Sequence, residues 1–189
     1  MRYVFAERVT AAALENPYIV VISGDFGFHT FDALKAARPR QYHNVGVCEQ
    51  AMVSVAAGMA IRGMIPVLFA ITPFLLERAF EQIKLDVGQQ HLKVILCGYD
   101  NYRKDGPTHC PLDAQAMCSL VKNLDFIQPE DEPEVREAVS AALDSDGPTF
   151  IHLTKAIARQ AKEPPILSFF EQDQPTEAEI LSLIKCDQL

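Results

Sequence analysis

The sequence predicts an α/β domain with a doubly wound, mostly parallel sheet and helices on both faces. Two observations carry this prediction. Short apolar runs without polar alternation, such as 18–24 and 65–70, are typical of strands buried on both faces. Stretches of helical length separate these runs, and strands alternating with helices form parallel sheets through crossover connections.

The expected elements follow one another along the chain. A first helix runs from Val4 to Asn16, and Pro17 ends it. The expected strands cover residues 18–24, 65–70, 94–97, 126–127 and 149–153, and residues 42–44 form a further short strand. The later helices are expected at residues 46–62, 75–89, 113–121 and 132–143.

The domain organisation expected from this pattern is one domain over residues 1–155. Residues 156–189 are too short for a second domain and form a C-terminal tail. Thr176 and Glu179 have the spacing of a capping box, which predicts a short helix in that tail.

Composition narrows the class of protein. Of 189 residues, 49% are hydrophobic and 22% charged, as in ordinary globular domains, and the net charge of −8 argues against nucleic acids and anionic membranes. No apolar run reaches the ~18 residues of a membrane span, so we expect a cytoplasmic protein. The five cysteines include no CxxC pair, and the histidines do not have the spacing of metal ligands, so no metal site is predicted. Cys110, which adjoins His109 in the sequence, is the one candidate for a catalytic nucleophile.

Glu49 is the most informative residue. Asn44 and Gly46 are expected to cap and open a helix that is rich in Ala and Gly, with Val47, Ala51, Val55 and Gly58 along one face. So apolar a helix should be buried on most sides, which places the Glu49 carboxylate in a dry site. Burial of a carboxylate costs several kcal/mol unless it is paired. The alternative is a solvent-facing first-turn Glu that interacts with the helix dipole.

Loops after the carboxyl ends of parallel strands are where such sheets bind ligands. The rule selects residues 25–28, 71–74 and 99–109, together with Glu49 after the expected short strand.

Four segments in order resemble the pyrimidine-binding domain of the transketolase family of thiamine diphosphate enzymes. They are Tyr42-His43-Asn44-Val45-Gly46-Val47-Cys48-Glu49-Gln50, residues 72–86 from Thr72-Pro73-Phe74, Asp105-Gly106-Pro107-Thr108-His109, and residues 128–134. The resemblance covers roughly residues 1–154. It implies that Glu49 hydrogen-bonds a ring nitrogen of the aminopyrimidine and favours the imino tautomer, which then deprotonates the thiazolium carbon.

The same resemblance gives roles to other residues. Phe74 lines or stacks on the pyrimidine, with Gly46 at the cofactor side of the helix entry, whereas Phe69 is expected in the core. His109 is the candidate for proton transfer or hydrogen bonding to the substrate, against the alternative that it only braces its loop. Glu49 and His109 are thus the predicted catalytic residues.

The resemblance also implies a partner. Gly24-Asp25-Phe26-Gly27 is only a superficial match to the family's Gly-Asp-Gly metal motif, so Asp25 is interpreted as structural or as an interface residue. We therefore expect the diphosphate, with Mg²⁺ or Ca²⁺, to be held by a larger subunit of a split transketolase, most simply in an α2β2 heterotetramer.

Two departures leave the substrate open. First, related enzymes commonly have Arg where this chain has His152. Second, the loop before the Asp-Gly-x-Thr-His motif lacks the Arg found in 1-deoxyxylulose-5-phosphate synthases. Arg103 could replace that missing Arg as a ligand for the substrate phosphate. Transfer of a two-carbon ketol unit from a ketose or ketose phosphate is the expected reaction. The alternatives are a beta-type subunit of a 2-oxo acid decarboxylase or dehydrogenase, and a non-catalytic subunit that kept the fold.

Overall fold

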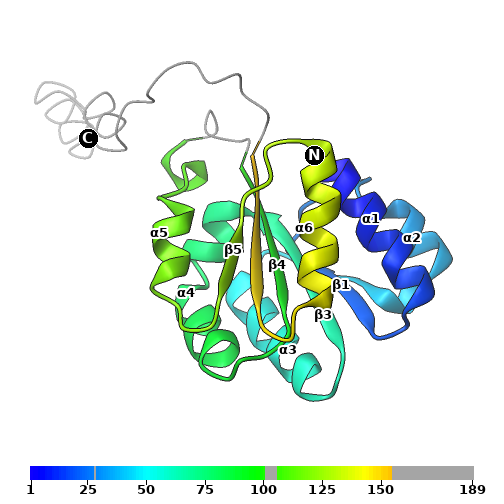
Figure 1. Ribbon diagram of the computed structural model, residues 1–189, viewed down its shortest axis with the longest axis horizontal. Helices are drawn as coiled ribbons and strands as arrows, with labels where there is room; N and C mark the ends of the chain where they lie inside the picture. The colour runs from blue at the N-terminus through cyan, green and yellow to red at the C-terminus, as the bar shows by residue number, and fades with distance from the viewer. Residues whose placement is uncertain (28, 101–105, 155–189) are drawn as a thin grey trace, which may run out of the picture. The chain divides into compact units, whose positions relative to one another are not determined.

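The computed structural model describes residues 1–27, 29–100 and 106–154, which belong to a compact unit spanning Met1–Ile157 (Figure 1). In these residues the chain forms a six-stranded sheet with the order β2-β1-β3-β4-β6-β5, and every neighbouring pair is parallel. The strands are β1 (Ile19–Ser23), β2 (Tyr42–Asn44), β3 (Ile65–Ile71), β4 (Ile95–Asp100), β5 (Asp125–Ile127) and β6 (Thr149–Thr154). The predicted doubly wound α/β fold is confirmed.

Helices cover both faces of the sheet. One face packs against α1 (Arg2–Glu15), α2 (Asp32–Ala37) and α6 (Glu132–Asp144), and α1 and α6 lie side by side (Figure 1). The other face packs against α3 (Glu49–Ile61), the π-helical segments η2 (Pro73–Glu77) and η3 (Ile83–Gly88), and α5 (Ala114–Ser119); α4 (Phe80–Gln82) joins η2 to η3. Short 3₁₀ turns lie at η1 (Pro39–Gln41) and η5 (Pro107–His109).

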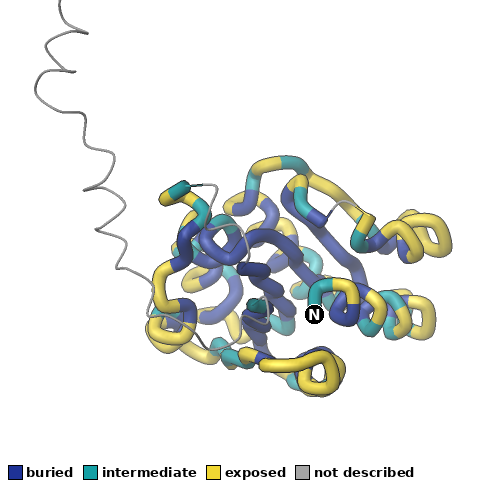
Figure 2. Tube along the Cα trace, turned by 90° about the horizontal axis from the view of Figure 1, so that it is seen from above, coloured by how far each residue is buried: buried dark blue, intermediate teal, exposed yellow. Residues whose placement is uncertain are grey.

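Two apolar layers result, one on each side of the sheet. Phe5, Phe31 and Phe69 are fully buried in the layer under α1 and α2, where Phe69 stacks on Phe5 and meets Phe31 edge to face, so Phe69 is a core residue as predicted. Figure 2 shows the strands in dark blue between helices whose outer turns are yellow. Because both faces are covered, the strands lack polar alternation.

Polar side chains fix several element ends. Asp113 and Asp131 cap α5 and α6 by accepting bonds from the N–H groups of Ala116 and Glu134 at 3.0 and 2.9 Å. Buried Gln41 donates from Nε2 to three carbonyl oxygens, those of Ala13, Asn16 and Ile19, at 2.8–3.0 Å. The amide thus ties the end of α1 to the start of β1.

The helix expected over residues 46–62 starts later than predicted, and the face that it packs against the sheet is opposite to the predicted one. Gly46 has φ +78°, and Cys48 has the non-helical values φ −147° and ψ 55°, so α3 begins at Glu49 and the predicted helix entry at Asn44 and Gly46 is wrong. The apolar stripe of Val47, Ala51, Val55 and Gly58 is exposed, because α3 uses its opposite face against the sheet. The expectation that this helix is buried on most sides is therefore wrong for the described chain.

The helix expected over residues 75–89 is not a regular α-helix. It consists of η2, the single turn α4 and η3. A π turn holds more residues than an α turn, and such turns are frequent at functional sites. Phe74 lies in η2, and Arg78 directly follows this segment as its cap. The short helix expected in the tail lies outside the described residues.

Candidate functional site

The candidate site lies at the carboxyl ends of the strands, where the strand order reverses. β1 pairs with β2 on one side and with β3 on the other, so the chain leaves β1 and β3 in opposite directions. Such a reversal opens a crevice in which doubly wound sheets bind ligands. The segment between β2 and α3, the segment η2 after β3 and the turn η5 after β4 meet at this edge.

Glu49 is the first residue of α3 and is only 2% exposed. The solvent-facing alternative is therefore wrong. Its Oε2 accepts a hydrogen bond from Nη1 of Arg78 at 3.2 Å, whereas its buried Oε1 has no hydrogen-bond partner among the described residues. An unpaired buried acceptor costs about 1–3 kcal/mol, and more when it is charged. Oε1 is therefore the atom of this site that most needs an outside donor.

A tight turn delivers Glu49 to this position. The Asn44 Oδ1 accepts bonds from the N–H groups of Asp25 and Gly46, both at 3.0 Å, and the Val45 N–H donates to the Ser23 carbonyl. Gly46 adopts the left-handed region at φ +78°, where a side chain is strained, and open space surrounds it. The turn thus needs glycine at Gly46 and leaves room beside the helix start.

Phe74, Arg78 and His109 complete the group around Glu49. The guanidinium of Arg78 lies 3.9 Å from the centroid of the Phe74 ring, and the Phe74 and His109 rings meet edge to face at 4.8 Å. Thr108 Oγ1 lies 3.0 Å from Nδ1 of His109. The structure thus connects Glu49 to His109 through a continuous row of contacts.

Glu77 holds the His109 turn against η2. Its Oε1 accepts a 2.7 Å hydrogen bond from the N–H of Leu112. Burial raises the pKa of the Glu77 carboxyl, and the bond from Leu112 opposes this increase in part. The residue before Arg78 therefore couples the two segments that carry Phe74 and His109.

This arrangement suits a planar heteroaromatic ligand. A buried carboxylate oxygen without a partner can exchange a proton with a ring nitrogen, an aromatic side chain offers stacking or edge contact, and an imidazole can donate or accept at neutral pH. These are the groups expected to hold an aminopyrimidine, so the side chains present fit that group. The described residues contain no cluster of three or more His, Cys, Asp or Glu side chains able to hold a metal ion.

The other residues predicted from the sequence do not join the group around Glu49, or they lie outside the residues that the structure describes. His152, near the end of β6, is buried, and its Nδ1 lies 3.2 Å from Oε1 of Gln128. Arg103 lies outside the described residues. Cys110 directs its Sγ toward the Gly106 carbonyl at 3.5 Å, whereas the His109 ring contacts Phe74, so neighbouring positions in sequence do not form a nucleophile–base pair here.

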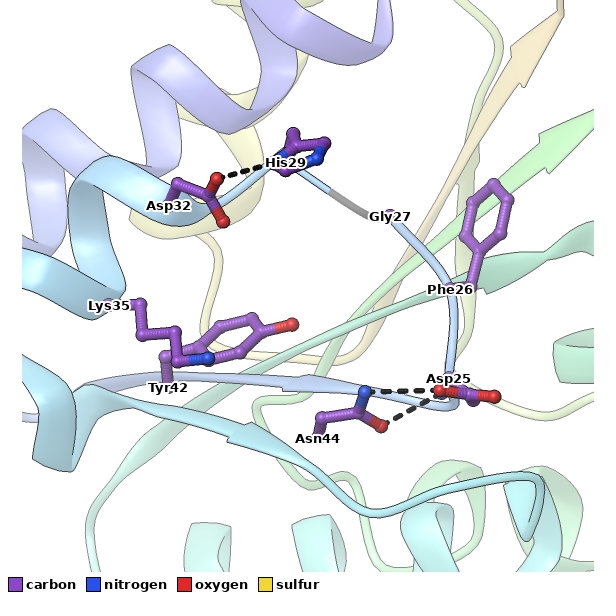
Figure 3. Close-up of a pocket in the computed structure, with 8 residues that line it drawn as sticks. All are labelled: Asp25, Phe26, Gly27, His29, Asp32, Lys35, Tyr42 and Asn44. Carbon is purple, nitrogen blue, oxygen red and sulfur yellow. Dashed lines mark hydrogen bonds and ion pairs between the residues drawn. The ribbon is translucent and has the colours of Figure 1, made fainter.

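A cavity of about 280 Å³ lies beside this site, at the ends of β1 and β2, on the side of the sheet that carries α2 (Figure 3). It is lined by Asp25, Phe26, Gly27, His29, Asp32, Lys35, Tyr42 and Asn44. Asp25 is bound to Asn44 through its backbone N–H, and His29 pairs with Asp32 at 2.8 Å (Figure 3). Asn44 therefore belongs both to this cavity wall and to the turn that places Glu49.

A doubly wound parallel sheet with a buried, half-paired carboxylate beside aromatic and imidazole rings defines an α/β domain whose candidate site suits a planar ligand. The family model described as "Transketolase, pyrimidine binding domain" matches residues 1–160. The chain belongs to this family of domains from thiamine diphosphate-dependent, transketolase-type enzymes.

Two comparisons extend this assignment. The chain is 38% identical over 150 residues to a 1-deoxy-D-xylulose-5-phosphate synthase of Crocosphaera subtropica, a match that covers 77% of this chain and 23% of that relative. The chain thus spans about a quarter of the length of the curated relatives that it matches. A solved split-gene transketolase, described as an inactive beta4 tetramer, superposes with a TM-score of 0.74 at 28% identity over 86% of this chain and 53% of that chain.

A second solved structure supports the fold. The transketolase from Leishmania mexicana superposes with a TM-score of 0.72 at 24% identity over 86% of this chain and 26% of its own. Among the residues that the structure describes, no helix has the length and apolarity of a membrane span.

Sequence reasoning missed Arg78 and Glu77. Both lie in the segment singled out for Phe74, but nothing local shows that Arg78 reaches a carboxylate 29 positions earlier. No local signal identifies Arg78, because its contact with Glu49 depends on how the strands pair.

Proposed function

We propose that this chain is the pyrimidine-binding subunit of a thiamine diphosphate-dependent enzyme that transfers a two-carbon ketol unit. The observation that carries the proposal is the Glu49 carboxylate, which is 2% exposed and has one paired and one unpaired oxygen. When bound, thiamine diphosphate supplies a thiazolium carbon that becomes a nucleophile after it loses a proton. The chain's own task is to hold and protonate the aminopyrimidine ring.

Each residue of the site has a distinct part in this task. Glu49 exchanges a proton with a pyrimidine ring nitrogen through Oε1. Exclusion of water from the site strengthens the hydrogen bond between these two atoms. Phe74 contacts the ring, and Gly46 keeps the helix entry clear. His109 hydrogen-bonds the substrate oxygens or moves a proton to them. Arg103 and His152 are proposed as substrate-binding residues.

The site needs a second polypeptide to be complete. Val47, just before α3, is 69% exposed, and Val55 and Ile61 within α3 are 47% and 69% exposed. Apolar side chains gathered on one helix face favour association. The resemblance to a split-gene transketolase supports an α2β2 assembly in which a larger subunit holds the diphosphate and Mg²⁺. Residues 156–189 are proposed as a tail rather than a domain, and the cytoplasmic location stays a prediction.

The test is reconstitution. The tagged full chain is used to isolate its partner from the native source, and the complex is assayed for ketol transfer from ketose phosphates with thiamine diphosphate and Mg²⁺. The complex should turn over, whereas the chain alone should show no transfer and weak cofactor binding. Robust turnover by the chain alone would contradict the split-subunit proposal.

A second candidate reaction follows from the curated relatives. Several are named 1-deoxy-D-xylulose-5-phosphate synthases and are 34–38% identical to this chain. The complex would then form a deoxy sugar phosphate rather than transfer a ketol unit. A screen of the same complex with 2-oxo acids and with ketose phosphates as donors separates the two reactions.

A further inference from the structure

We propose that Arg78 is a positioning residue for the cofactor site, holding the Glu49 carboxylate and the Phe74 ring in their binding geometry before the cofactor arrives. This inference rests on the proposed function of Glu49. It adds a residue to which neither the family resemblance nor the comparisons assign a role.

The first support is that the two oxygens of the Glu49 carboxylate have different surroundings. Arg78 Nη1 bonds Oε2 at 3.2 Å, and Oε1 is left without a partner among the described residues. A guanidinium is planar and always charged, so it fixes the orientation of the carboxylate that it binds. With Oε2 held, Oε1 is the oxygen available to a ring nitrogen.

The second support is the contact with Phe74. The guanidinium carbon lies 3.9 Å from the ring centroid, a close cation–π distance. Arg78 thus contacts both the acid and the aromatic side chain of the predicted site. Phe74 lies in η2 and Arg78 caps its end, four residues further along, a spacing that places both side chains on the same helix face.

The third support is the asymmetry of burial. The Glu49 side chain is 1% exposed, whereas that of Arg78 is 40% exposed. Removal of Arg78 leaves a charge that water cannot reach, while removal of Glu49 leaves a cation that water can solvate. The chain offers a matched control in the Arg136–Glu7 pair, where the distance is 3.3 Å and Arg136 is 45% exposed, but Glu7 is 66% exposed.

The first experiment measures thermal unfolding of the full chain without cofactor. Arg78→Met should lower the unfolding midpoint by roughly 5–10 °C, and adding Glu49→Gln to it should recover most of that loss. Arg136→Met and Glu7→Gln should have small, additive effects. Additive effects at Arg78 and Glu49 would overturn the proposal.

The second experiment measures thiamine diphosphate affinity by calorimetry in the complex with the partner subunit. Arg78→Met should raise the dissociation constant roughly 10- to 100-fold, and Arg78→Lys should recover part of the loss, since it restores the charge but not the planar stack. Arg136→Met should bind like the wild type. Unchanged or tighter binding by Arg78→Met would overturn the proposal, the latter because the guanidinium would then occupy the cofactor's own place.

A third readout covers the case in which Arg78→Met does not fold. In the NMR spectrum of the wild-type chain, the Arg78 side-chain protons should be shifted upfield by the Phe74 ring, and Phe74→Leu should abolish this shift. Unshifted Arg78 protons in the wild type would overturn the proposal. If Arg78→Met weakens cofactor binding but Glu49→Gln leaves activity intact, the proposed function fails and not the positioning role.

Discussion

Replacement of Val55 by Asp should dissociate the assembly without unfolding the chain. Val47, Val55 and Ile61 are 69%, 47% and 69% exposed. Complete burial of such a side chain is worth about 1.5–3 kcal/mol. Scaled by the exposed fractions, the three side chains gain roughly 3–5 kcal/mol when a partner covers them.

The Asp side chain acts in two ways. It removes about 1 kcal/mol of this gain and places a charge in the covered face, which costs several kcal/mol more. We therefore expect the dissociation constant to rise by a factor of about 1,000 or more, since each 1.4 kcal/mol is a factor of ten. Because Val55 is already half exposed, the free energy of unfolding of the dissociated chain should fall by only about 1–1.5 kcal/mol.

Sedimentation velocity of the reconstituted complex measures the association, and chemical denaturation of the chain measures its stability. Leu14→Asp on α1 is the matched control, since Leu14 is 43% exposed and lies on a helix that covers the other face of the sheet. It should leave the assembly intact. Equal sedimentation of the wild type and Val55→Asp would refute the assignment of the α3 stripe to an interface.

Three further predictions concern the chain itself. Gln41→Leu should cost about 2–4 kcal/mol in urea denaturation, because it leaves buried carbonyls of Ala13 and Ile19 without a donor; an unchanged midpoint would show that water replaces the amide. Burial raises the pKa of the Glu77 carboxyl, so the folded chain holds this proton more tightly than the unfolded chain does. The stability that protonated Glu77 contributes is therefore fully present below about pH 4.3 and is lost as the pH rises through the raised pKa. Glu77→Gln, which keeps the acceptor for Leu112, should flatten this decline in denaturation series across pH, and an identical slope would contradict it. Burial also raises the pKa of Cys118 to about 12 and raises that of Cys97 well above its usual range, so in a Cys186→Ser chain a thiol reagent should modify half-buried Cys48 first, and rapid labelling of Cys97 would contradict the described core.

Most of the fold was predictable because a strand that is buried on both faces produces a continuous apolar run in the sequence. Val20, Val21 and Ile22 form a continuous apolar run since both faces of β1 are covered, and the same holds for β3 and β4. The burial of Glu49 was expected from its apolar neighbours along the helix, but several of these are exposed; Glu49 is buried because it lies on the same face of α3 as Met52, Val53 and Ala56.

The face of α3 that meets the sheet was not predictable in this way. Both Val55 and Val53 lie on apolar stripes of this helix, yet Val53 is buried and Val55 is exposed. When two faces of a helix are apolar, periodicity does not distinguish the one that packs against its own sheet from the one left for a partner.

The π-helical turn and the Arg78–Glu49 pair escaped prediction for a third reason. Residue 78 reaches residue 49 only after β3 has paired with β1 and brought η2 beside α3. The pairing is a product of tertiary structure, and a local pattern does not encode it.

The central claim is that the Glu49 carboxylate drives proton exchange in the bound cofactor. The most direct measurement is the rate at which the thiazolium C2 proton of thiamine diphosphate exchanges with deuterium in the reconstituted complex, followed by quenched-flow NMR. The wild-type complex should accelerate this exchange, and Glu49→Gln should slow it by a factor of about 100 or more, the usual contribution of a positioned acid–base group, while Glu7→Gln should not. Equal exchange rates in the wild type and Glu49→Gln would contradict the account.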